Sequence, residues 1–102
     1  MTELERSYRH LQTLTFPSVP DDEGLAHVIE LMSELDATLT RLAASAGRGA
    51  KVSADDVPMI RGVVNRLNDI GELPEDDADI YVATVKYLEG LASLRDALLQ
   101  NG

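Results

Sequence analysis

The chain has 102 residues, no cysteine, and 18 acidic against nine basic residues, which give a formal net charge of −9. A chain of this length is expected to form a single domain over residues 1–102 with a true hydrophobic core, and the missing cysteines exclude disulfides and thiolate metal sites. The negative charge repels phosphate backbones, so direct nucleic-acid binding is disfavoured.

The first predicted element is a short amphipathic helix over about residues 2–15. Its apolar residues recur at helical spacing among charged ones: Leu4, Tyr8, Leu11 and Leu14. Pro17 and Pro20 then end the helix, and Phe16 and Val19 are expected to dock on the rest of the protein. No segment has the apolar run of a signal peptide or a membrane span, so a cytoplasmic protein without membrane insertion is expected.

A long second helix is predicted over about residues 21–46. Its first three residues are acidic, and carboxylates there can accept from free amides and face the positive end of the helix dipole. Apolar residues then follow alternating steps of three and four: Leu25, Val28, Met32, Leu35, Leu39, Leu42 and Ala46. Such a stripe is typical of a helix in a bundle, and Gly47 is the expected stop.

A glycine-containing linker over residues 47–53 leads to a third predicted helix over about residues 54–70. Pro58 is expected in its first turn, where the missing amide donor costs little. Apolar residues follow at helical spacing: Ile60, Val63, Val64, Leu67 and Ile70. Gly71 is expected to end the helix.

The fourth predicted helix covers about residues 75–100 and begins with a group of acids. Its apolar residues form a band too broad for a single contact: Ile80, Tyr81, Val85, Tyr87, Leu88, Leu91, Leu94, Leu98 and Leu99. The helix is therefore expected between two neighbours, with Gly90 allowing one of them to approach closely. The elements together predict an all-α fold, a small antiparallel helical bundle of three long helices and a shorter N-terminal one.

Few residue groups in this chain could carry chemistry. Glu23, His27 and Glu30 share one helix face and offer metal ligands, but a usable site needs further ligands and a second shell that the chain does not supply. The acidic clusters do not match a calcium-binding loop, and no phosphate-binding glycine loop or nucleophile motif is present. The sequence therefore predicts no catalytic residue, no metal site and no cofactor.

The leading functional interpretation is a non-catalytic helical protein that binds, inhibits or scaffolds a macromolecular partner, in the manner of an antitoxin, an immunity protein or an inhibitor. Its partner-binding surface is predicted at the start of the fourth helix: Glu75, Asp76, Asp77, Asp79 and Tyr81. Helix capping needs one or two of these carboxylates, and a basic protein partner would relieve the repulsion among the excess. The chain itself is expected to be a monomer or a homodimer.

Two other functional classes remain open, a small all-α enzyme and a ligand-binding regulator. Both need a pocket between the helices, lined by the few buried polar groups. For the acidic residues, the plain alternative to a binding role is helix capping and compensation of the helix dipole. The two roles of the acids differ under mutation: if the surface binds a partner, charge-neutral replacements at Asp76, Asp77 and Asp79 should leave the fold intact, slow association and flatten its salt dependence.

Overall fold

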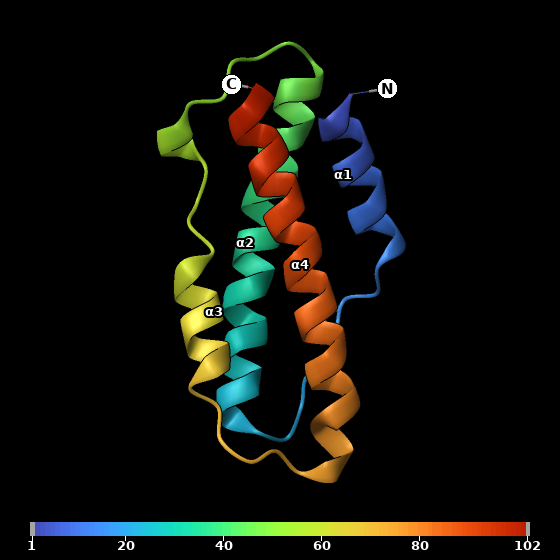
Figure 1. Ribbon diagram of the computed structural model, residues 1–102, viewed down its shortest axis with the longest axis vertical. Coiled ribbons are helices and arrows are strands. Elements are labelled where there is room, and N and C mark those ends of the chain that lie inside the picture. The colour runs from blue at the N-terminus through green and yellow to red at the C-terminus, as the bar shows by residue number, and fades with distance from the viewer. Residues whose placement is uncertain (1, 102) are drawn as a thin grey trace.

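The computed structural model describes residues 2–101, and every regular element among them is helical (Figure 1). The helices are α1 (Glu3–Thr13), α2 (Glu23–Gly47), α3 (Arg61–Asn68) and α4 (Ala78–Asn101), with two short 3₁₀ turns, η1 (Ala54–Asp56) and η2 (Glu75–Asp77). The predicted all-α fold class is confirmed. None of these helices is long and apolar enough to cross a membrane within the described part of the chain.

The two long helices, α2 and α4, lie side by side along an elongated molecule of 45 × 25 × 16 Å. Helix α3 lies against α2, and α1 lies mainly against α4. The colour gradient of Figure 1 shows that α2 and α4 run in the same direction and both begin at the lower end. The positive ends of two helix dipoles therefore lie at one end of the molecule.

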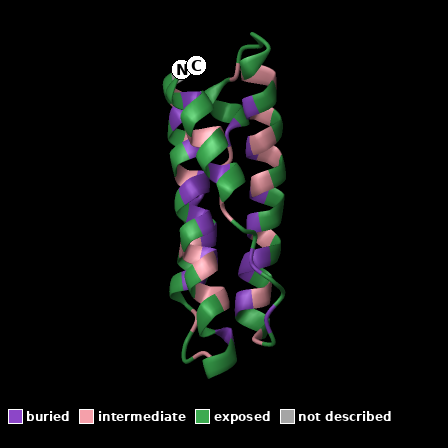
Figure 2. Ribbon diagram, turned by 90° about the vertical axis from the view of Figure 1, so that its right-hand side faces the viewer, coloured by how far each residue is buried: buried purple, intermediate pink, exposed green. Residues whose placement is uncertain are grey.

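The hydrophobic core lies between α2 and α4, with α1 and α3 covering its sides, and Figure 2 shows buried residues along both long helices. The predicted stripe of α2 faces this core at five positions: Leu25, Val28, Met32, Leu35 and Leu39. Helix α4 contributes buried leucines on its facing side: Leu88, Leu91, Leu94 and Leu98. The broad apolar band of α4 is explained by its contacts with both α1 and α2.

The predicted third helix over residues 54–70 is wrong in its first half. Ser53 and Asp56 form a reciprocal capping box that supports only the η1 turn. Val57 is then extended, with φ −89° and ψ 113°, because the ring of Pro58 disfavours helical geometry in the residue before it. The carbonyl of Pro58 accepts a hydrogen bond from Nε of Arg95 at 3.2 Å, which holds this segment against α4. The fold therefore has two long helices rather than three.

Two glycines determine how neighbouring segments meet. Helix α2 ends at Gly47, as predicted, but the left-handed residue that closes its end is Gly49, which alone has a positive φ, +88°, among the described residues. The amides of Gly49 and Ala50 donate to the carbonyls of Ala46 and Ser45, each at 3.0 Å, which completes a Schellman-type end. At Gly90 the predicted close approach is confirmed, since an added Cβ would lie 2.8 Å from Cδ1 of Leu14 in the segment that follows α1.

Candidate functional site

The fold brings three acid-rich segments to the end of the molecule where α2 and α4 begin (Figure 1). They are residues 21–23 before and at the start of α2, residues 69–72 after α3, and residues 75–79 around the start of α4. These segments hold half of the 18 acidic residues and no lysine or arginine. We call this surface the acidic end, and its members are Asp21, Asp22, Glu23, Asp69, Glu72, Glu75, Asp76, Asp77 and Asp79.

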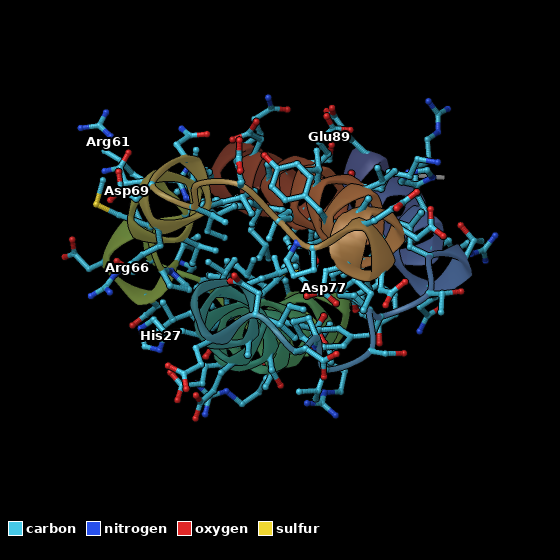
Figure 3. All side chains as sticks on the ribbon, turned by 90° about the horizontal axis from the view of Figure 1, so that it is seen from below. His27, Arg61, Arg66, Asp69, Asp77 and Glu89 are labelled. Atoms are coloured by element: carbon cyan, nitrogen blue, oxygen red, sulfur yellow. The ribbon has the colours of Figure 1, made fainter. Side chains whose placement is uncertain are left out.

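Two members of the acidic end make hydrogen bonds that hold the fold together. Oδ1 of Asp22 accepts from the backbone amide of Leu25 at 2.9 Å and so caps α2. Asp77 is only 3% exposed, and its Oδ2 accepts from the backbone amide of Asp22 at 3.1 Å. Figure 3 shows Asp77 at the centre of this end, between the starts of α2 and α4. Asp77 therefore ties the start of α4 to the start of α2.

The other seven carboxylates of the acidic end are exposed. None of their side chains makes a hydrogen bond or an ion pair with the residues that the structure describes. Pro74 precedes the η2 turn, which has no side-chain cap, so neither Glu75 nor Asp76 acts as a capping residue there. Like charges gathered on one surface repel each other, and here that repulsion is not offset by a paired cation.

The structure divides the five residues predicted for the partner-binding surface into three groups. Glu75, Asp76 and Asp79 are exposed on the acidic end. Tyr81 is half buried and packs against the core. Asp77 lies inside, so its carboxylate is used in the fold rather than presented on the surface.

A polar groove of about 520 Å³ lies beside the acidic end, between α2 and the end of α3. His27 on α2 and Arg66 and Asp69 on or next to α3 line it, and Figure 3 shows these three side chains on the same flank of the molecule. Within residues 2–101, no three or more His, Asp or Glu side chains are grouped so that they could hold a metal ion, and this includes Glu23, His27 and Glu30. Arg66 is the only lysine or arginine that lines this groove.

The connection between α1 and α2 has a surface that the sequence did not reveal. Phe16 packs as expected, with its ring edge-to-face against Tyr87 at a centroid distance of 5.0 Å. Burial and the hydrogen bond from the hydroxyl of Tyr87 to Asp36, at 2.9 Å, raise the pKa of this tyrosine above its ordinary value. Val19, which was also expected to dock, is 82% exposed. The sequence feature that could have indicated this exposure is the pair of prolines. Pro17 and Pro20 are both buried, and the two residues between them are exposed to solvent.

Comparison with protein families, curated proteins and solved structures finds no match to this chain. The description of the acidic end therefore rests on the residues of this chain alone. Seven of its carboxylates are exposed, and two, those of Asp22 and Asp77, accept hydrogen bonds at the starts of α2 and α4. Chemically, such a surface can attract cations and basic protein surfaces at long range.

Proposed function

We propose that the protein is a non-catalytic interaction module, a small helical bundle whose acidic end binds a basic surface of a protein partner. The observation that carries this proposal is the set of seven exposed carboxylates that neither cap a helix nor pair with a cation among the described residues. Helix dipoles account for one or two acids at each helix start, and this surface has more. A basic partner would replace their mutual repulsion with attraction.

An inhibitor is the form of this function that the charge favours most. A target that binds nucleic acids presents a basic surface, and an acidic protein can occupy that surface in place of the phosphate backbone. Antitoxins and immunity proteins can act in this way, and the cytoplasm is the setting that we propose. Tyr81, half buried two residues after Asp79, would add an apolar contact beside the charges.

A ligand-binding regulator or a small enzyme is the alternative, and the groove of His27, Arg66 and Asp69 is the observation that favours it. Three acids, Asp22, Glu23 and Asp69, line the same groove and repel anionic ligands. This makes the groove a weaker candidate than the acidic end. Under our proposal, Arg66→Ala leaves the affinity for the protein partner unchanged within about twofold.

The test of the proposed function begins with affinity purification from extracts of the source organism, followed by kinetics with the recovered partner. The test variant is Glu75→Gln/Asp76→Asn/Asp79→Asn, which leaves the hydrogen bonds of Asp22 and Asp77 intact. The control variant is Glu3→Gln/Glu34→Gln/Glu89→Gln, which neutralises the same number of exposed carboxylates elsewhere. Surface plasmon resonance at low and high salt gives the association rate constants.

We expect the test variant to associate about tenfold more slowly at low salt and to lose most of the salt dependence, because rim charges act mainly on the association rate. The control variant should change the rate by about twofold at most. If the test variant associates at the wild-type rate with the wild-type salt dependence, the acidic end is not the binding surface. The basic residues near the opposite end, Arg48 and Lys51 in the glycine-containing loop, then become the next surface to test.

A further inference from the structure

An apolar groove of about 610 Å³ adjoins the acidic end, between the connection that follows α1 and the outer face of α2. Phe16 and Val19 line it from the connection, and Ala26 and Ile29 line it from α2. Figure 2 shows this connection descending from α1 towards the start of α2. The polar groove lies on the α3 side of α2 and is adjacent to this one, since Glu23 and His27 line both.

Apolar side chains are exposed here because the connection is held in an extended form. Pro17 and Pro20 are buried, and the contact of Phe16 with Tyr87 fixes its upper part. Val19 is 82% exposed and Phe16 is 36% exposed, so two of the four exposed large apolar residues in the described chain line this one groove. Exposed apolar residues that cluster in a groove are typical of a binding surface, whereas scattered ones are ordinary.

The border of the groove is negative. Glu23 and Glu30 line it and are exposed, and Asp21 follows Val19 by two residues. His27 is the sole basic side chain in the lining, and no lysine or arginine contributes. An apolar floor with an acidic border is complementary to a segment in which a large apolar side chain is flanked by cations.

We propose that this groove binds a large apolar side chain from a segment of the protein partner that is rich in lysine and arginine. The inference rests on the proposed function and assigns a different step of partner binding to each of two surfaces. The acidic end attracts the basic partner and sets the association rate, while the groove buries an apolar anchor and slows dissociation. Val19 and Phe16 are the residues that the anchor contacts.

The probe for this proposal is a fluorescein-labelled peptide of about five helical turns, with leucine on one face and lysine on the other. The control peptide has glutamine in place of leucine, which preserves the charge and the helix propensity but removes the apolar anchors. Fluorescence anisotropy at about 0.15 M salt measures both affinities. We expect the leucine peptide to bind at least tenfold more tightly than the glutamine peptide.

The matched protein variants locate the binding site. Val19→Ser should weaken binding of the leucine peptide by about fivefold, whereas Val82→Ser, at a half-exposed valine on α4, should not. Glu30→Gln should weaken it by about twofold, whereas Glu89→Gln should not, because Glu89 lies on the opposite side of the molecule from His27 (Figure 3). Thermal unfolding checks that each exposed-site variant retains the fold.

Equal affinity for the two peptides, or wild-type affinity of the Val19→Ser variant for the leucine peptide, would overturn the proposal. Either result leaves the proposed function in place if the Glu75/Asp76/Asp79 variant still slows association with the natural partner. Conversely, if that variant has no effect on the partner but Val19→Ser still weakens the leucine peptide, the groove is a binding site and the role of the acidic end is wrong. The two failures are therefore distinguishable.

Discussion

Asp77 shows how little a residue's type reveals about its role. Asp76 and Asp77 are neighbours of the same type, but one is exposed and the other is 3% exposed and bonded to the amide of Asp22. The local sequence predicts only that acidic residues occur at the start of α4, because the helix dipole favours negative charge at the N-terminal end of any helix. Which acid turns inward depends on how the start of α4 packs against the start of α2, and this contact spans 55 positions of the chain.

The buried hydrogen bond of Asp77 leads to a stability prediction. Asp77→Ala removes the acceptor and leaves the amide of Asp22 unsatisfied, so we expect the free energy of unfolding to fall by about 1–3 kcal/mol. Asp77→Asn retains an oxygen acceptor and should lose less. Chemical denaturation measures both, with Asp76→Ala as the exposed control, expected within about 0.5 kcal/mol of the wild type. Equal, small losses for Asp77→Ala and Asp76→Ala would show that this bond does not hold the two helix starts together.

At the scale of elements, apolar periodicity predicts the helices that bury a continuous stripe. The long second and fourth helices were predicted within a few residues of α2 and α4, because each has apolar residues at helical spacing along its whole length. The third helix was predicted to begin too early in the chain, because Pro58 was assigned to its first turn. In the structure Pro58 precedes α3, and its carbonyl is held by Arg95 from α4. That contact between distant segments left no signal in the local pattern.

The packing of α1 and its following residues on α4 can be tested at Gly90. Glycine to alanine normally favours a helix by about 1 kcal/mol. At Gly90 the new methyl group would meet the Cδ1 atoms of Leu14 and Leu11 at 2.8 and 3.1 Å, so these side chains must move. We therefore expect Gly90→Ala to bring no gain in the free energy of unfolding and to speed amide hydrogen exchange in α1.

The matched control for Gly90 is Gly62 in α3, where an added Cβ meets no atom within 4 Å. Gly62→Ala should raise the free energy of unfolding by about 0.5–1 kcal/mol. An equal gain for Gly90→Ala would mean that the two leucines move aside without cost and that α1 does not require this close approach.

For the whole molecule, the distribution of charge is the property that sequence predicts least well. Each acid-rich segment is visible in the sequence, and the one around Glu75 was singled out for binding. That residues 21–23 and 69–72 join it at one end follows only from the fold, in which α2 and α4 begin side by side. The same arrangement brings the positive ends of two helix dipoles together, which gives the acids a competing structural role.

Salt dependence of stability separates these two roles. In water, two unit charges about 10 Å apart repel by about 0.4 kcal/mol, and each exposed carboxylate of the acidic end faces six others. The favourable interaction with the helix dipole offsets about 0.3–1 kcal/mol of this repulsion for each acid in a first turn. Repulsion should therefore exceed the dipole term when salt does not screen it. At about 0.01 M salt the screening length is about 30 Å, which exceeds the 25 × 16 Å cross-section of the molecule.

We accordingly expect Glu75→Gln/Asp76→Asn/Asp79→Asn to raise the free energy of unfolding by about 1 kcal/mol at about 0.01 M salt, and to lose this advantage at about 0.5 M. The Glu3/Glu34/Glu89 control variant, whose charges are spread over three helix regions, should gain less. Urea denaturation at the two salt concentrations makes the comparison. A triple variant less stable than the wild type at low salt would show that these carboxylates stabilise the helix starts, and the excess charge that carries the proposed function would then have a structural cause.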